Sequence, residues 1–180
     1  MMPPGHVAIT WAAADLYPEK RLDYRLLALC ALLPDLIDKP LAIWVFPTSH
    51  SSQNVAHALL PHLALLLIAL LWQHRALPYI LAFNAHLIAD RMWNHTETFW
   101  WPLFGWNTFW QFKAMNTPET MLSVYLDIIT RYPQVWVVEI LAMLFLGYFV
   151  WKYRLYAWKV GKRFLLTGKT ISNDELAMMN

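Results

Sequence analysis

The sequence predicts an all-α protein, a polytopic membrane bundle of about five hydrophobic segments, some of them short or re-entrant, plus one interfacial amphipathic helix. Of its 180 residues, 58% are hydrophobic and 14% are charged, whereas soluble domains carry roughly 25% charged residues. Uncharged stretches of helical length and a dense block of tryptophan are two further membrane signals. Lipid is therefore expected to be part of the solvent of this chain.

Length and charge limit the function classes. Residues 1–160 are expected to form a single membrane-embedded helical domain, followed by a polar, partly flexible tail over 161–180. The net charge is +2 and no long basic run is present, so a nucleic-acid partner is not expected. The single cysteine, Cys30, excludes an intramolecular disulfide. No charged stretch precedes an apolar core at the N-terminus, so no cleaved signal peptide is expected.

The first two hydrophobic segments are short. Residues 5–17 predict a helix that ends before Pro18, and a second helix is predicted from Tyr24 to Leu33, stopping at Pro34. Both are shorter than the ~20 residues of a full membrane span. They are expected to span with their flanks, to tilt, or to enter the bilayer only part-way. Residues 41–54 begin apolar and end as a serine-rich loop.

The next two segments predict a helical hairpin. Val55 to Trp72 contains 18 residues without a formal charge and is the clearest predicted span, although Pro61 predicts a kink beside His57. Residues 73–75 form a polar turn, and residues 76–89 run back uncharged.

Aromatic and amphipathic segments follow. Residues 99–112 carry eight aromatics in fourteen positions, which predicts an interfacial belt, with a re-entrant or surface helix as the alternative and a lid over a lipid-like substrate as a secondary role. Thr117 to Tyr132 predicts an amphipathic helix along the interface. Pro133 to Trp151 predicts the last span and contains Glu139, either a functional carboxylate or a neutral, hydrogen-bonded one.

Basic residues predict the topology. Lys20, Arg21 and Arg25 lie in the first turn, Arg75 in the second, and five Lys and Arg residues lie within 152–163. Placing all of them in the cytoplasm gives five spans in alternating directions. Four residues then approach the opposite, outer face from different segments: His6, Asp35, His57 and Asp90.

Histidine and aspartate residues on these segments predict a metal site. His86 and Asp90 are four residues apart and share one helix face, while Asp35 and Asp38 share a face if the helix continues past Pro34. Carboxylates in an apolar bundle need cationic partners, and a divalent ion is one such partner. The candidate metal-site residues are His6, Asp35, Asp38, His57, His86 and Asp90.

Other interpretations of these residues stay open. Asp38 could pair with Lys39, and Asp90 with Arg91 or another arginine, and His6 could be an ordinary polar residue at a helix start. Glu97 and Asp90 are the candidate catalytic proton acceptors, and the alternative for Glu97 is a carboxylate that supports the metal ligands from behind. Four histidines are expected in loops or at the interface, outside the metal site: His50, His62, His74 and His95.

Five motifs occur in one order along residues 4–106: GHVAIT, LLPDLIDKP, NVAHALL, AHLIADRMW and TFWWPLFGW. In this order the chain resembles the YdjM-like family of inner-membrane metal-dependent hydrolases and, more distantly, the zinc-dependent phospholipase C proteins. The resemblance implies a multi-pass protein of the inner (cytoplasmic) membrane. It also implies a metal site formed by His6, Asp35, His57, His86 and Asp90, with Asp38 as a further candidate.

The segment around His57 departs from the family pattern. The family usually has Gly before this histidine and Thr or Ser after it, whereas this chain has Ala56 and Ala58. The basic residue that often precedes it is replaced by the stretch 51–54, SSQN. If that basic residue contacts a substrate phosphate, the activity is altered or lost in this chain.

Residues and resemblance together predict a membrane-embedded hydrolase. A divalent ion would activate a water molecule to attack an ester or phosphoester substrate, and lipids are among the candidate substrates. The mixture of His and Asp ligands favours zinc as this ion. Membrane lipids are the expected partners. The alternative is a non-catalytic integral membrane protein whose histidines and aspartates bind a structural ion or form a buried polar network. A transporter is less favoured because no internal repeat is visible.

Overall fold

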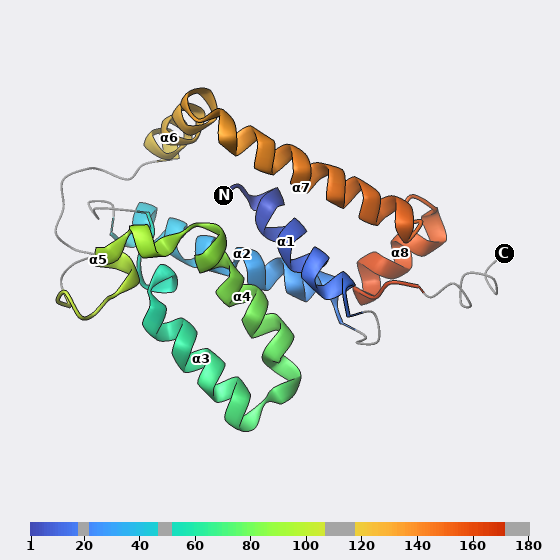
Figure 1. Cartoon of the computed structure of the whole chain (residues 1–180), viewed down its shortest axis with the longest axis horizontal. Coiled ribbons are helices and arrows are strands. Elements are labelled where there is room, and N and C mark those ends of the chain that lie inside the picture. Colours follow the sequence, from blue (N-terminus) through green and yellow to red (C-terminus); the bar gives the residue numbers. More distant parts are fainter. Residues whose placement is uncertain (18–21, 47–51, 107–117, 172–180) are drawn as a thin grey trace.

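The computed structural model describes residues 1–17, 22–46, 52–106 and 118–171, and the regular elements of these residues are all helical. The predicted all-α fold class is therefore confirmed. Three helices form the centre: α1 (Pro3–Asp15), α2 (Tyr24–Pro40) and α4 (Leu77–Ala89). Helix α2 packs against both α1 and α4, and the long helix α7 (Pro133–Lys152) lies along the other side of α1 (Figure 1).

The remaining elements surround this centre. Helix α3 (Leu59–Trp72) pairs with α4 in a hairpin that projects from the body of the molecule (Figure 1). Helix α5 (Thr96–Phe99) follows α4, α6 (Pro118–Arg131) precedes α7, and α8 (Trp158–Thr167) follows it. Short helical turns connect these helices: η1 (Leu41–Val45), η2 (Val55–His57), η3 (His74–Ala76) and η4 (Met92–Asn94).

Helix α2 does not stop at Pro34, so that prediction is wrong. The helix runs on to Pro40, with both prolines inside it. A proline in a helix removes one backbone hydrogen bond and costs about 3 kcal/mol. Pro34 is almost completely buried between packed helices, and this packing holds the chain in helical conformation. Because the helix continues past Pro34, Asp35 and Asp38 lie on the same helix, as the predicted metal site requires.

The predicted hairpin is also shorter than expected. The stretch from Val55 to Trp72 is interrupted at Ala58, which is extended (φ −81°, ψ 148°) between η2 and α3. Pro61 lies in the first turn of α3, so the predicted kink is instead a complete break. Helix α3 has 14 residues and rises about 21 Å, less than the ~30 Å hydrocarbon core.

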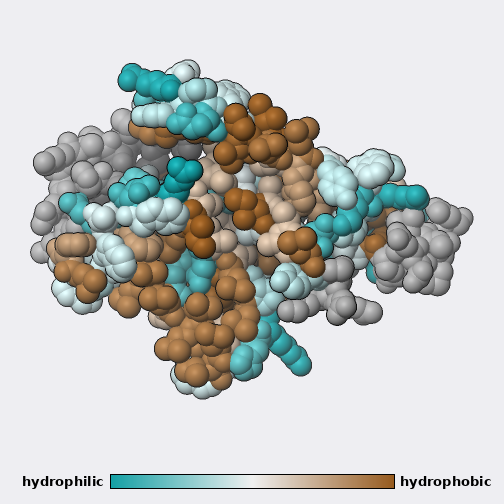
Figure 2. All heavy atoms as spheres, viewed as in Figure 1, coloured by the Kyte–Doolittle hydropathy of each residue, from teal (hydrophilic) through white to brown (hydrophobic). Residues whose placement is uncertain are grey.

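Helix α7 meets the length expected of a membrane span. It has 20 residues and is long and apolar enough to cross a bilayer, the only such helix in the part of the chain that the structure describes. The five-span topology stays a prediction. Hydrophobic surface nevertheless extends over both α7 and the α3–α4 hairpin (Figure 2). Leu67 and Leu71 on α3 are 56% and 58% exposed, as expected for side chains that face lipid rather than a protein core.

The interfacial segments are described only in part. Trp100, Phe104 and Trp106 are exposed after α5, while residues 107–112 of the aromatic block and Thr117 lie outside the described residues. The predicted amphipathic helix is observed as α6, with Leu122 and Leu126 exposed. His50 also lies outside the described residues.

An aromatic core joins the three central helices to α7 and α8. Phe149 of α7 is completely buried, and its ring lies 4.7 Å from the ring of Trp11 and 5.0 Å from that of Tyr24. Phe164 of α8 belongs to the same cluster. Helix α8 therefore runs across the predicted domain boundary at residue 160. We call this set the aromatic core: Ala14, Tyr24, Leu27, Ala82, Phe149 and Phe164.

Candidate metal centre

Four of the predicted metal-site residues meet at one place. Asp35 comes from α2, His57 from η2, His86 from α4, and Asp90 from the end of α4. One possible ligand atom from each lies within 4.8 Å of the other three. Both imidazoles are completely buried, whereas the side chains of Asp35 and Asp90 are 12% and 9% exposed. We call these four residues the His/Asp cluster.

Asp38 fixes the orientation of His57. Its carboxylate accepts the backbone N–H groups of Asn54, Ala56 and His57 at 2.7, 3.0 and 3.1 Å. The same carboxylate lies 2.7 Å from Nδ1 of His57. Because an ionised carboxylate only accepts, Nδ1 carries the proton and the lone pair of the neutral ring is on Nε2. Asp38 is therefore a positioning residue for His57 rather than a member of the cluster.

A backbone carbonyl does the same for His86. Its Nδ1 donates to the carbonyl oxygen of Ala31 on α2 at 2.8 Å. A carbonyl oxygen cannot donate, so the lone pair of the neutral His86 ring is also on Nε2. Both rings thus have their protons held by partners behind them. This is how histidine ligands are oriented in metal sites.

The four ligand atoms form a set of acceptors with no donor between them. The two Nε2 atoms are 3.1 Å apart, and Oδ1 of Asp35 is 3.6 Å from His57 Nε2. Oδ2 of Asp90 is 3.5 Å from His86 Nε2. A tetrahedral zinc ion with bonds of about 2.0–2.2 Å needs ligand atoms roughly 3.3–3.6 Å apart. Both the chemistry and the spacing of the four groups therefore fit a divalent ion.

Each carboxylate of the cluster also has a cationic neighbour. Lys39 donates to Asp35 at 2.6 Å, and the N-terminal ammonium of Met1 donates to Asp90 at 2.6 Å. Burial raises the pKa of Asp90, but the contact with His6 and the hydrogen bond from the N-terminal ammonium lower it, and on balance that pKa is held well below its usual range. Burial also raises the pKa of Asp35, whereas the hydrogen bond and the positive charge of Lys39 lower it, and on balance this pKa is lowered. Both groups are therefore ionised at neutral pH.

The predicted alternative pairs are not formed. Lys39 binds Asp35 and not Asp38, because residues four apart on a helix share a face. Asp90 contacts Met1, His6 and His86 instead of Arg91. The two acidic residues are thus directed into the cluster rather than toward their sequence neighbours.

Comparison with known proteins identifies the family of this chain. The sequence model of the family described as YdjM inner membrane protein matches residues 1–159. The chain belongs to the YdjM inner membrane protein family. The match contains every residue of the His/Asp cluster, and it supports an inner-membrane location for this chain. No curated protein and no solved structure matches the chain. Hydrolase activity and the likeness to phospholipase C stay predictions.

In this YdjM family member, His6 lies beside the cluster. Its Nε2 is 3.2 Å from Oδ1 of Asp90, and its ring stacks on that of His86 at a centroid distance of 4.0 Å. The other ring nitrogen, Nδ1, is buried and has no hydrogen-bond partner among the residues that the structure describes. His6 is not one of the four converging residues, and it supports Asp90 and His86 from the side of α1.

Glu139 connects the spanning helix α7 to this site. It is 8% exposed, and its two carboxylate oxygens accept the backbone N–H groups of Met2 at 2.8 Å and Gly5 at 3.1 Å. Helix α1 has no side-chain cap of its own, so Glu139 caps it from a different helix. The membrane carboxylate predicted to be functional or hydrogen-bonded thus holds the start of the helix that carries His6.

Glu97 and His62 lie outside the four converging residues. Glu97 is exposed in the first turn of α5 and is not one of the four converging residues. His62, expected in a loop or at the interface, is buried in α3, so that prediction is wrong. Its Nε2 donates to the carbonyl oxygen of Ala56 at 2.8 Å and so supports the turn that carries His57. The available signal was its position in an uncharged stretch, where a polar side chain needs a partner.

Proposed function

We propose that this YdjM family member is a membrane-embedded, metal-dependent hydrolase that acts on an ester or phosphoester close to the membrane. One observation carries the proposal: two imidazole nitrogens and two carboxylates converge, with the proton of each ring held on the far nitrogen. Four acceptors that face one another repel unless a cation lies between them. The family membership supports placing this chemistry at the inner membrane.

The residues of the cluster would hold the ion, and the His/Asp mixture favours zinc. When bound, a divalent ion polarises the substrate and lowers the pKa of water toward neutrality. Asp38 and the Ala31 carbonyl orient the two imidazoles, and burial of these rings keeps bulk water from them. These groups are pre-organised, so little reorganisation is needed during a reaction.

Asp90 is the favoured proton acceptor of the two predicted candidates. Its carboxylate belongs to the cluster and is 9% exposed, with Oδ2 toward His86 and Oδ1 bound to the N-terminal ammonium of Met1. Glu97 is exposed on α5, outside the four converging residues. A role for Glu97 would require substrate to reach between α5 and the cluster.

A second candidate function is a non-catalytic structural ion or a polar network. It is favoured by the two ammonium groups that already neutralise the carboxylates, Lys39 on Asp35 and the N-terminus on Asp90. A proton shared between the two Nε2 atoms would complete such a network without any metal. The alanines beside His57, where the family pattern has other residues, support the same alternative.

Elemental analysis of the full chain purified in detergent tests the proposal. We expect about one zinc ion per chain, or the same occupancy after reloading, and none in the His86→Ala/Asp90→Ala double variant. Asp15→Asn is the control, since Asp15 is a part-buried carboxylate that binds Lys152 far from the cluster. Absence of metal in the wild type after reloading with Zn²⁺ or Mn²⁺ would leave only the polar network.

Chelation separates the catalytic from the structural ion. A catalytic ion should leave with chelator while the helical content and unfolding temperature stay close to those of the loaded protein. Removal of a structural ion should instead unfold the protein or lower its unfolding temperature markedly. Hydrolysis of phospholipid and model phosphoesters by wild type, absent in the double variant, then completes the test.

A further inference from the structure

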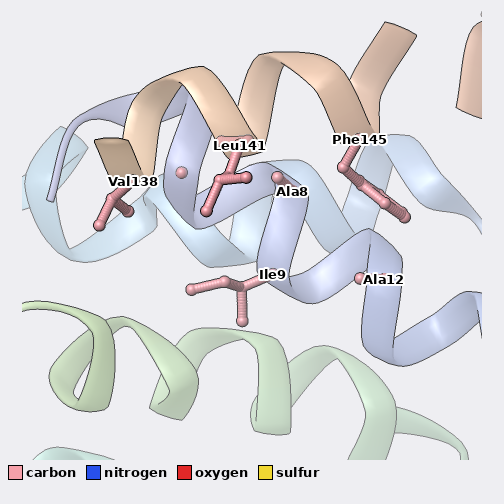
Figure 3. Close-up of a pocket in the computed structure, with 8 residues that line it drawn as sticks. Ala8, Ile9, Ala12, Val138, Leu141 and Phe145 are labelled. Carbon is pink, nitrogen blue, oxygen red and sulfur yellow. The ribbon is translucent and has the colours of Figure 1, made fainter. Parts of the chain in front are cut away.

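An apolar groove runs between α1 and the spanning helix α7. Its volume is about 290 Å³. Ala8, Ile9 and Ala12 line it from α1, and Val138, Leu141 and Phe145 from α7 (Figure 3). The alanines on the α1 side keep the two helices from filling the space between them. Every residue that lines the groove is apolar.

The α7 wall of the groove lies among exposed apolar side chains. Leu141, which lines it, is 60% exposed, and the neighbouring Val137 and Leu144 are 59% and 65% exposed. An apolar groove has no hydrogen bonds to offer water, so filling it with hydrocarbon is favourable. Because α7 is the candidate span of an inner-membrane protein, the hydrocarbon available there is that of the bilayer.

One end of the groove reaches the polar side of α1. Gly5, the first groove residue, precedes His6. A Cβ on Gly5 would lie 2.5 Å from the Met1 side chain and 3.0 Å from Glu139. The ammonium of Met1 in turn binds Asp90 of the cluster. A single residue, Met1, therefore stands between the apolar groove and a carboxylate of the candidate metal centre.

An apolar groove that ends at a polar centre matches an amphiphile. We propose that the groove between α1 and α7 holds an acyl chain of a membrane lipid, and that the ester or phosphoester headgroup of this lipid lies at the His/Asp cluster. This inference rests on the proposed hydrolase function and narrows its substrate class to lipids. A helix from a second copy of the chain is the competing occupant.

Photo-crosslinking tests the occupant of the groove. The zinc-loaded full chain is placed in lipid nanodiscs that contain phosphatidylglycerol with a diazirine in its acyl chain, and labelled peptides are mapped by mass spectrometry. We expect labelling of α1 and α7 at groove residues. Ala12→Phe fills the groove and should reduce this labelling at least fivefold, while Ala13→Phe, on the exposed neighbouring position, should not.

A second pair of variants guards against misfolding of the first. Val138→Trp fills the groove from α7, and Val137→Trp places the same ring on the exposed neighbour. Equal labelling in the filled and control variants, with zinc retained, overturns the lipid groove and leaves the metal centre standing. Crosslinks between two copies of the chain at the groove also overturn it.

Competition tests the position of the headgroup. In zinc-loaded protein, unlabelled phosphatidylglycerol should displace the probe at least threefold better than the diacylglycerol that lacks its phosphate, and this preference should vanish without zinc. An equal preference with and without zinc overturns the placement of the headgroup. If no zinc binds while groove labelling persists, the proposed hydrolase fails and the lipid substrate fails with it.

Discussion

Helices α1, α2 and α4 contribute to two regions of the molecule, and the two regions are built differently. In the first region Trp11 and Tyr24 pack on Phe149, and Ala82 of α4 belongs to the same aromatic core. In the second region the same three helices present His6, Asp35 and His86, with their polar partners, to the candidate metal centre.

This comparison separates the residues that stabilise the fold from the residues that form the candidate ion site. In the aromatic core, burial and ring contacts favour one arrangement, and no outside component is needed. In the His/Asp cluster, acceptors face one another and need a cation or a shared proton. Local conflict of this kind within a consistent fold is expected at functional sites. The core should therefore decide stability, and the cluster should decide ion binding.

The largest expected effect is at the aromatic core. Phe149→Ala removes a completely buried ring and should lower the free energy of unfolding by about 3–5 kcal/mol. Zinc bound per folded chain should stay the same. Leu144→Ala on the exposed face of α7 is the control, with a change of about 0.5 kcal/mol or less. Thermal unfolding in one detergent measures both, and loss of zinc from folded Phe149→Ala would contradict the separation.

Replacement of Asp38 tests the candidate metal centre. Asp38→Asn keeps the shape of the side chain but replaces one acceptor with an amide, so the three N–H groups and His57 Nδ1 can no longer all be satisfied. Loss of such a supporting carboxylate typically reduces metal affinity about 10- to 100-fold. Competition with a chromophoric chelator measures the change. Asp15→Asn, at the end of α1 far from His6, should leave the metal affinity unchanged. An equal loss of affinity in both variants would show a general effect of charge.

The sequence predicted the parts of this site that follow from local spacing. His86 and Asp90 share a face because four residues complete about one helical turn. The order of the motifs and the short hairpins indicated that distant segments meet. The role of Asp38 could not be predicted, because it depends on the backbone N–H groups of residues 54, 56 and 57, whose direction is set by the break at Ala58.

Tertiary packing explains the two helix boundaries that were predicted wrongly from the sequence. Pro34 is a strong local stop signal, but its burial between helices outweighs the lost hydrogen bond. In the hydrophobic run before Trp72, Pro61 signals a kink but not the complete break at Ala58, because alanine itself is compatible with a helix. It leaves the helix where His62 and Asp38 bind the turn in front of it. Both departures bring polar groups toward the His/Asp cluster.

Glu139 holds the start of α1 and should have a smaller effect than the residues of either region. Glu139→Gln keeps one acceptor for the N–H groups of Met2 and Gly5 but loses the charge that favours a helix N-terminus. We expect a loss of about 1 kcal/mol of unfolding free energy, equal in zinc-free and zinc-loaded protein. Chemical unfolding with and without chelator measures it. A loss confined to the zinc-loaded form would place Glu139 in ion binding instead of helix capping.

The smallest expected effect concerns the joint between α2 and α8. Asp23 accepts the N–H groups of Arg25 and Leu26, and Arg25 donates to the carbonyls of Leu165 and Leu166. The hydrogen bond from the Arg25 side chain outweighs burial and lowers the pKa of Asp23 from 3.8. A lowered folded-state pKa stabilises the fold above the unfolded value, and this stabilisation is lost as pH falls through the folded value.

Asp23→Asn isolates this charge, because asparagine caps a helix about as well as aspartate. The variant should lose only a few tenths of a kcal/mol at pH 7, as exposed ion pairs typically contribute. Unfolding measured from pH 7 to pH 3 should show the difference from wild type holding above about pH 4 and shrinking below it. A difference that persists unchanged into acid would mean that the amide disturbs the cap itself, and not that an ion pair has been lost.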